Sequence, residues 1–378
     1  ELTATKLAEK CYYGMFQYCA SLATAPVLPA KTLTDGCYYA MLRGTAISEA
    51  PELPATALTK ECYMSMFINC TSLTKAPALP ATTLTDSCYR QMFFGCSSLT
   101  EAPELPATTL ASSCYYSMFY GCSGLTSVPE LPATTLTDSC YRQMFEKCTS
   151  LTEVSKLPST TLMNSCYQRM FKDCTSLTEA PELPAVKLAT YCYESMFSGC
   201  TNLNKIACHA GNRAITGCSD NWVSGVSTTG TFIKLPGITW PIGVNGIPEG
   251  WTIEELDYDI VECYTGSSVN TCSAPIVRGT GSTWYVINSA NTYVAQTTCP
   301  LTKPLLKIKG TYLTEKAFSG LTNIVSATSE SAITKAQTAF YGCTNLVDAS
   351  GLKMSASIEA SAYTSMFQNC SKLSSAPA

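Results

Sequence analysis

Apolar and polar positions along the chain repeat at a nearly constant interval. The segment Cys-Tyr-x-x-Met-Phe-x-x-Cys recurs with small variations, and its copies follow one another at a nearly fixed spacing. Such self-similarity is typical of a solenoid, in which each copy buries its apolar face against its neighbours. The copies begin at Cys11, Cys37, Cys62, Cys88, Cys114, Cys140, Cys166 and Cys192.

The Cys-Tyr segment has the pattern of a short amphipathic helix. At about 100° per residue, its cysteines, tyrosine, methionine and phenylalanine fall on one continuous apolar face. The other face carries polar residues in several copies, such as Arg142 and Gln143. A helix this short is marginal in isolation, so we expect each copy to depend on its neighbours.

The block between two such segments, for example residues 99–106, contains prolines that cannot donate a backbone hydrogen bond. It therefore predicts a short strand at Leu-Thr-Glu-Ala, followed by an extended proline turn. One strand and one short helix in about 26 residues is the pattern of a leucine-rich repeat, whose units span roughly 20–29 residues. The expected fold class is an α/β repeat solenoid.

We expect three parts in the chain. Residues 1–218 form the leucine-rich repeat solenoid of about eight copies, residues 219–309 form a β-rich cap and connector module, and residues 310–378 form a second, degenerate repeat segment. Both ends of the sequence align with interior positions of a repeat. We therefore expect the sequence to be a piece of a longer array.

The middle part is defined by the loss of the period. Cys208 and His209 replace the Glu-Leu of other copies, and the repeat is no longer visible after that copy. Residues 219–252 are rich in Gly, Thr and Trp, and we interpret them as a cap that closes the exposed end of the stack. Strand-like runs at 282–286 and 292–296 predict a small β module.

Residues 317–324 and 339–346, together with the Met-Phe-x-x-Cys-x-x-Leu copies, resemble the BspA-like leucine-rich repeat. The resemblance covers residues 1–218 closely and 310–378 more loosely, and the copies here are longer than that family's usual unit. It implies an extracellular or cell-surface location, because the family occurs on surface proteins of commensal anaerobic bacteria and of some parasites. It also implies adhesion, the role of most members that have a known one.

Composition narrows the function classes. Charged residues make up 14% of the chain, against about 25% in an average soluble protein. The formal net charge of −4 does not suit a protein that follows the phosphates of a nucleic acid. No apolar run reaches the roughly 20 residues of a membrane span, so we expect no transmembrane segment.

Most of the 22 cysteines belong to the repeat. Residues eight apart on a helix are separated by about 12 Å, whereas a disulfide needs Cα atoms within about 7 Å. We therefore expect a ladder of buried free thiols that act as small apolar fillers. Cys263, Cys272 and Cys299 lie off the repeat pattern and are disulfide candidates in a secreted protein, with free thiols as the alternative.

Residues with catalytic or metal-binding chemistry are sparse. The chain has one histidine, His209, and lacks a Gly-x-Ser-x-Gly elbow, a phosphate-binding glycine loop and a His-Glu-x-x-His motif. The repeated glutamates offer carboxylate pairs, but even repetition favours a solvated face. A zinc site made of Cys208, His209 and Cys218 would lack the paired spacings of such sites. We expect no enzymatic activity, metal or cofactor.

The strand of each copy is the best candidate for function. Two positions flank its alanine and point away from the leucine-filled interior, on the concave face of the solenoid. Glutamates predominate there, and eight copies at about 4.8 Å each make a strip roughly 40 Å long. The candidate partner-binding residues are Glu49, Glu52, Lys75, Glu101, Glu104, Glu130, Glu153, Lys156, Glu179 and Glu182.

The leading hypothesis is a non-enzymatic extracellular recognition or adhesion module that binds a protein or glycan through this strip. The alternative is a structural spacer or fibre component, including a bacteriophage fibre, with no ligand on that face. In the alternative the glutamates only keep the stack soluble.

Overall fold

The computed structural model describes residues 2–159, 161–185, 187–211, 215–234, 238–255, 259–262, 276–278, 284–287, 293–296, 305–309, 318–329, 332–333, 336–356 and 361–377. For the strands between 259 and 296, and for residues 305, 307 and 309, only the backbone is described. The chain divides into two compact units, Glu1–Glu255 and Leu256–Ala378.

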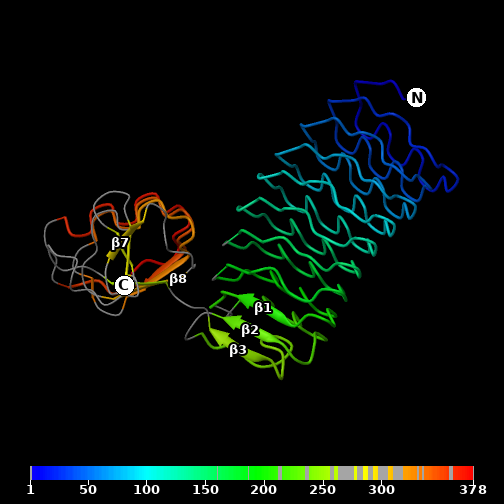
Figure 1. The fold of residues 1–378 in the computed structure, drawn as a ribbon. Helices are drawn as coiled ribbons and strands as arrows, with labels where there is room; N and C mark the ends of the chain where they lie inside the picture. Colours follow the sequence, from blue (N-terminus) through cyan, green and yellow to red (C-terminus); the bar gives the residue numbers. More distant parts are fainter. Residues whose placement is uncertain are drawn as a thin grey trace. The chain divides into compact units, whose positions relative to one another are not determined.

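The first unit is a stack of similar coils, each about one sequence repeat long (Figure 1). Every coil contains one Cys-Tyr segment and one proline-containing segment, so equivalent residues of successive copies lie one above another. The predicted repeat solenoid is confirmed at this level. The secondary structure expected for each copy is not confirmed, because the described residues contain no helix and few strands.

The Cys-Tyr segment is a run of turns, so the helix prediction was wrong. Its backbone N–H groups alternate between two kinds of partner. Arg90 donates within its own coil to the carbonyl of Ser87 (3.2 Å), whereas Tyr89 donates to the carbonyl of Cys114 in the next coil (3.1 Å). We call this segment of each coil, such as residues 87–96, the turn ribbon. It forms because adjacent coils supply acceptors that an isolated helix would have to find in its own backbone.

Every fourth residue of the turn ribbon has a left-handed backbone. In one copy these residues are Ser87, Gln91 and Gly95, with φ of 55°, 55° and 71°. A period of four corresponds to about 90° per residue, close to the 100° or so of a helix, so a segment this short presents the same face in either structure. The predicted apolar face is therefore confirmed, and side chains such as Cys88 and Phe93 are fully buried.

Regular strands occur only at the end of the first unit's described part. They are β1 (Lys205–Cys208), β2 (Thr231–Lys234) and β3 (Thr252–Glu255), which pair in parallel in the order β1-β2-β3 (Figure 1). In earlier coils the predicted strand is reduced to isolated parallel bridges, such as Glu49 with Lys75 and Ser127 with Glu153. The prolines that follow limit the ladder because they lack N–H groups.

Ladders of identical side chains fill the interior of the first unit. The tyrosine rings of the turn ribbon stack on one another at centroid distances of 5.7–6.3 Å, and the phenylalanine rings do so at 5.5–5.9 Å. Trp222 continues both ladders, since it stacks on Tyr193 at 6.1 Å and contacts Phe197 at 6.2 Å. The core is thus one continuous column through the coils.

Residues 219–255 belong to the first unit, although the sequence repeat is not visible in them. Gly217, Asn221 and Gly225 have left-handed backbones with the same spacing of four, so a further turn ribbon follows the eighth. The indole N–H of Trp222 donates to the Gly246 carbonyl at 2.7 Å, which ties this ribbon to the residues that follow. The spacing of left-handed residues therefore continues beyond the last visible sequence repeat.

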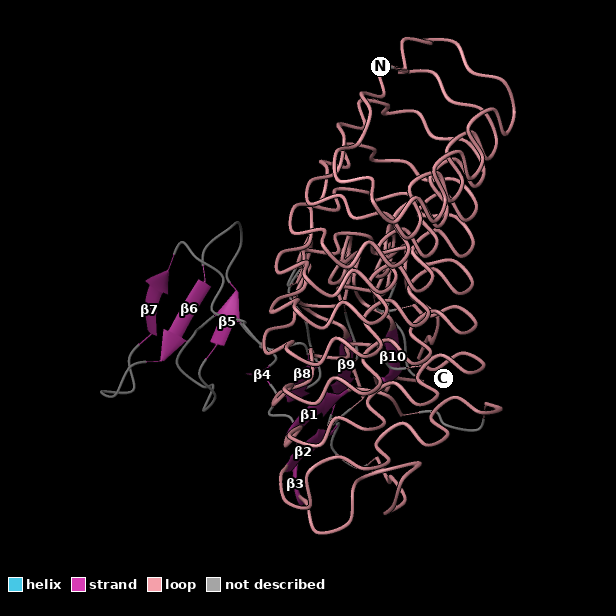
Figure 2. Ribbon diagram, turned by 90° about the vertical axis from the view of Figure 1, so that its right-hand side faces the viewer, coloured by secondary structure: helices cyan, strands magenta, loops and turns pink. Residues whose placement is uncertain are grey.

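The second unit contains two sheets (Figure 2). Strands β10 (Asp348–Gly351), β9 (Ser326–Ser329), β8 (Leu305–Lys309) and β4 (Asp259–Glu262) pair in parallel in that order. Strands β5 (Ile276–Arg278), β6 (Trp284–Ile287) and β7 (Tyr293–Gln296) form an antiparallel sheet. The runs predicted at 282–286 and 292–296 overlap β6 and β7.

Most cysteines of the stacked coils are buried free thiols, as predicted, whereas Cys11 and Cys19 of the first coil are exposed. The buried thiols do more than fill space. The second cysteine of a coil directs its Sγ to a carbonyl of the preceding coil, as Cys96 does to Phe67 at 3.0 Å. Burial raises the pKa of Cys88 to about 11. Cys263, Cys272 and Cys299 lie outside the described residues.

Candidate partner-binding face

The ten candidate residues lie in two columns on one exposed face of the first unit. Parallel bridges join Glu49 to Lys75, Ser127 to Glu153, and Glu179 to Lys205, so the positions of the first column are in register. The second column lies three residues further along each coil. All ten side chains are exposed. We call this surface the acidic strip, and it comprises Glu49, Glu52, Lys75, Glu101, Glu104, Glu130, Glu153, Lys156, Glu179 and Glu182.

Local sequence explains why these side chains face outward. Between the two columns each coil carries an alanine or valine that packs against the core, as Ala50 and Ala76 do. The leucine after the second column, such as Leu53 or Leu105, is buried. Because the apolar residues on either side pack inward, the glutamates between them face solvent. The structure brings the predicted residues together, and binding of a partner through them stays a prediction.

Neighbouring coils place glutamates and lysines beside one another within the strip. Lys205 Nζ lies 3.0 Å from Glu179 Oε2, and both side chains are about half exposed. Exposed pairs of this kind contribute about 0–1 kcal/mol. The equivalent positions Glu49 and Lys75 are in register but form no ion pair among the described residues. Their charges are therefore available to a partner.

One neighbour of the strip was missed by the sequence analysis. His209 is fully buried, and its Nε2 lies 3.2 Å from Glu182 Oε1. The angles of this contact fall short of a good hydrogen bond, and neither ring nitrogen has a hydrogen-bond partner within the described part of the chain. The contact with His209 is the main reason why the pKa of Glu182 is lowered, and Lys156 contributes to the same shift. The degenerate eighth copy was the only signal of this pair.

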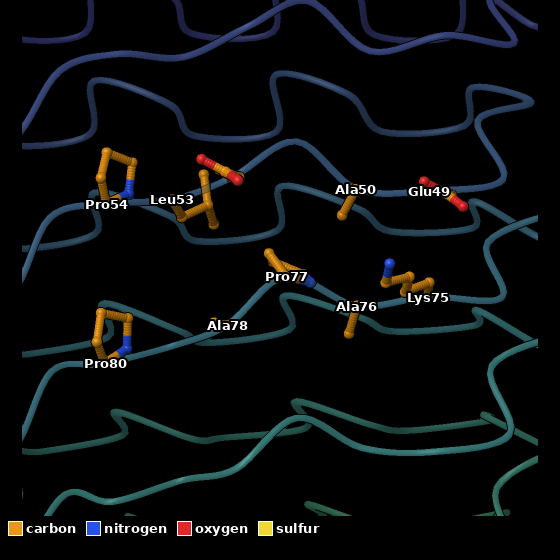
Figure 3. A pocket seen from close by; sticks show the side chains of 10 residues that line it. Glu49, Ala50, Leu53, Pro54, Lys75, Ala76, Pro77, Ala78 and Pro80 are labelled. Atoms are coloured by element: carbon orange, nitrogen blue, oxygen red, sulfur yellow. The ribbon is translucent and has the colours of Figure 1, made fainter.

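A groove of about 460 Å³ interrupts the strip at Ala78 (Figure 3). Its two sides come from successive coils, one carrying Glu49 and Glu52 and the other carrying Lys75 and Ala78. Figure 3 shows small side chains and prolines along it, with no aromatic ring among the residues drawn. Ala78 occupies a position that holds glutamate or lysine in the next four coils, so a long side chain is missing beside the groove.

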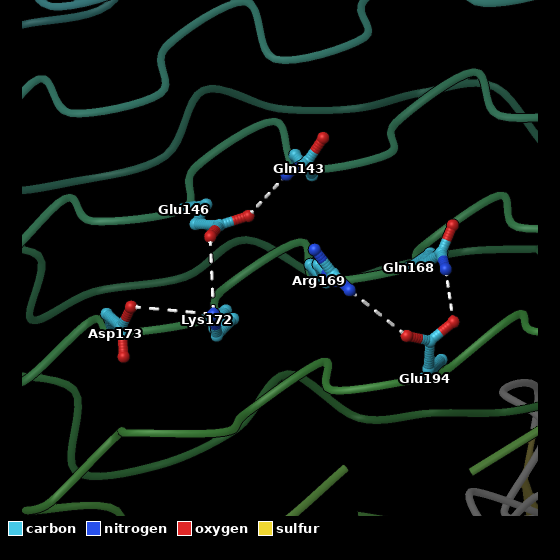
Figure 4. A network of polar contacts seen from close by, with 7 residues as sticks. All are labelled: Gln143, Glu146, Gln168, Arg169, Lys172, Asp173 and Glu194. Carbon is cyan, nitrogen blue, oxygen red and sulfur yellow. Dashed lines mark hydrogen bonds and ion pairs between the residues drawn. The ribbon is translucent and has the colours of Figure 1, made fainter. Parts of the chain in front are cut away.

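A second polar cluster lies on the turn ribbons of later coils (Figure 4). Glu146 is almost fully buried, accepts a hydrogen bond from Gln143 at 2.8 Å and lies 3.6 Å from Lys172 in the next coil. Glu194 similarly joins Gln168 and Arg169 across a coil boundary. These contacts link side chains that pack between coils, so we assign the cluster a structural role.

Aromatic and cationic side chains stack on the outer side of the ribbons. The guanidinium carbons of Arg90 and Arg142 lie 4.5 Å and 5.4 Å from the ring centre of Tyr116, which stands between them. Phe94 and Tyr120 stack at 4.4 Å. Since each ring covers the face of the next, these residues reinforce the stacking of coils.

The region considered for zinc contains no cluster of ligands. In the described residues no three histidine, cysteine or acidic side chains lie close enough together to hold a metal ion. Nor do the described residues include a long apolar helix able to cross a membrane.

Comparison with known proteins identifies the repeat. The family described as BspA type leucine-rich repeat region matches in six copies, which fall within residues 9–143, 112–220 and 291–377. These ranges cover most of the chain and include parts of both units. No curated protein and no solved structure matches the chain significantly.

Proposed function

We propose that this chain, which belongs to the BspA type leucine-rich repeat family, is a non-enzymatic recognition or adhesion module. It acts outside the cell or on the cell surface and binds a protein or glycan through the acidic strip. Membership of a repeat family whose coils form extended surfaces supports a binding role. The strip supplies the place where a partner would dock.

One observation carries the proposal. Exposed carboxylates recur at equivalent positions on most coils between Glu49 and Glu182, although most of the residues around them are small, apolar or hydroxylated. At about 4.8 Å per coil, such columns present a regular series of charges to a long partner. Like charges brought this close repel one another, which favours a partner that neutralises them.

The test is a binding screen of the purified chain on arrays of extracellular proteins and glycans. A variant in which Glu101, Glu104, Glu130 and Glu153 are replaced by lysine is screened beside it. Each replacement adds two charges, so the formal net charge changes from −4 to +4. A control with the same change places lysine at four acidic positions outside the strip, namely Glu9, Glu61, Asp220 and Glu254.

A partner that binds the chain and the control but not the strip variant would support the proposal and locate its surface. Binding that survives in the strip variant would refute it. A blank for every form would favour the structural spacer or fibre component. In that case sedimentation should show a defined oligomer, since a fibre component needs contacts between copies.

A further inference from the structure

The second column of the acidic strip contains one position where a side chain is missing. In the later coils the column has a lysine, Lys156, between Glu130 and Glu182. In the earlier coils the same column has Ala78 between Glu52 and Glu104. The two triplets are equivalent, because in both of them each member lies one sequence repeat after the member before it.

The later triplet shows which chemistry fits between two glutamates of the column. Lys156 interacts electrostatically with Glu182 and favours its ionised form. The amine of a lysine at this position therefore stabilises the carboxylate of the following coil by charge attraction. At Ala78 no such charge is present, and the groove described above opens in its place.

The lining of the groove suits the whole length of a cationic side chain. Ala50, Ala76 and Pro77 offer an apolar surface for an aliphatic stem, while Glu49 and Glu52 offer carboxylates for its charged end. Lysine and arginine bury such stems and keep their charged groups near polar partners. Lys75 also borders the groove, so its net formal charge is −1 from two glutamates and one lysine.

We infer that the groove at Ala78 is a socket for a lysine or arginine side chain of a partner protein. The inserted cation lies beside Glu49 and Glu52 and supplies the positive charge that Lys156 supplies at the equivalent position of the later triplet. This inference rests on the proposed function, since it names the chemistry of a partner that binds the acidic strip. To the proposed function it adds one binding subsite on the strip and the type of partner side chain that the subsite accepts.

The absence of aromatic side chains from the groove favours a protein over a glycan. Sugar rings are commonly held against an aromatic face, and the residues that line this groove are aliphatic, proline, acidic or basic. A cationic glycan carries amines but no long aliphatic stem. Binding of a glycan in place of a lysine peptide would therefore overturn the inference.

The experiment uses the full chain labelled with ¹³C in its alanine methyl groups. The probe is a capped alanine peptide with one central lysine, and its control is the same peptide with the lysine acetylated. We expect the lysine peptide to shift the methyl signals of Ala50, Ala76 and Ala78. The acetylated peptide should not, because it keeps the stem but loses the charge. Added salt should weaken the shifts.

Two variants test the place of binding. Ala78→Lys should abolish the shifts of Ala50 and Ala76, since its own amine fills the socket. Lys156 shows that a coil accepts lysine at this position, so the variant should fold. Lys156→Ala should open an equivalent socket between the coils of Glu130 and Glu153, and the lysine peptide should then also shift the methyl signal of the alanine introduced there, which is the counterpart of Ala78.

Equal shifts with both peptides, shifts elsewhere on the strip, or no shifts at all would overturn the inference. Shifts caused by a chitosan oligosaccharide but not by the lysine peptide would overturn it in favour of a glycan. The array screen separates the two proposals. A partner lost by the four-glutamate variant but retained by Ala78→Lys would leave the proposed function standing without the socket.

Discussion

Cys122 directs its Sγ to the backbone carbonyl of Phe93 in the preceding coil, at a distance of 3.0 Å. The same carbonyl accepts the backbone N–H of Cys96 within its own coil. The thiol is therefore a polar link between coils as well as a small apolar filler. In the second of the eight copies, which lacks this cysteine, the hydroxyl of Thr45 donates instead to the Leu42 carbonyl of its own coil at 2.8 Å.

Replacing Cys122 should show how much this link contributes. Cys122→Ala removes a buried sulfur and its hydrogen bond, so we expect the free energy of unfolding to fall by about 1–2 kcal/mol. Cys122→Thr should cost less, because Thr45 shows that the slot accepts a hydroxyl. Urea unfolding followed by circular dichroism measures both. A threonine variant that is less stable than the alanine variant would contradict this view of the slot.

The phenylalanine ladder should hold neighbouring coils together. Phe119 is fully buried and stacks at 5.5 Å on both Phe93 and Phe145. Phe119→Ala should lower the free energy of unfolding by about 3–5 kcal/mol. It should also split the transition, because a repeat array depends on contacts between adjacent coils. Phe94→Ala, on the partly exposed side of the ribbon, is the control, and calorimetry that shows equal losses would refute the face assignment.

Stability should fall at alkaline pH because of the buried thiols. Desolvation raises the pKa of Cys88 and of Cys140 from the ordinary 9.0 to about 11. A group whose pKa is higher in the folded state stabilises it below the unfolded pKa, and this contribution is lost as the pH rises through the folded value. The free energy of unfolding should therefore decrease between about pH 9 and pH 11.

Urea titrations at a series of pH values measure this loss. A double variant, Cys88→Ala and Cys140→Ala, should start less stable and lose less over the same range. Thiol alkylation of the native chain at pH 8 should be slow at both buried cysteines and faster at the exposed Cys11 and Cys19. Stability that stays constant up to pH 11 in the parent chain would rule out this effect.

The contact between Glu182 and His209 should affect the free energy of unfolding at acidic pH. The pKa of Glu182 is lowered by His209, so its contribution to stability is present above the unfolded pKa, near 4.5, and is lost as the pH falls. The effect should be small, because about half of the Glu182 side chain is exposed. Glu182→Gln should make the acid-induced loss of stability shallower, whereas Glu130→Gln in the same column should not. Identical acid profiles for both variants would show that the contact contributes nothing.

The sequence by itself determined the period, the buried face and the exposed columns. A repeat of nearly constant length aligns equivalent positions on neighbouring coils whatever local structure each coil adopts. Cys88, Met92 and Phe93 face inward for this reason, and Glu101 and Glu104 face outward because the residues around them are apolar. Alternation and periodicity are local properties, and they can be read without knowledge of the fold.

Only the tertiary structure decided how the backbone bonds are satisfied. Tyr89 donates to Cys114 in the next coil, a partner one full repeat away that no local pattern reveals. A ribbon with a period of four and a helix with a period near 3.6 give the same apolar face over so short a segment, so the pattern favoured a helix that does not form. The groove at Ala78 and the buried His209 beside Glu182 likewise depend on contacts between coils. The physical reason is the same for all of them, because each is created by a neighbour that is distant in sequence and adjacent in the stack.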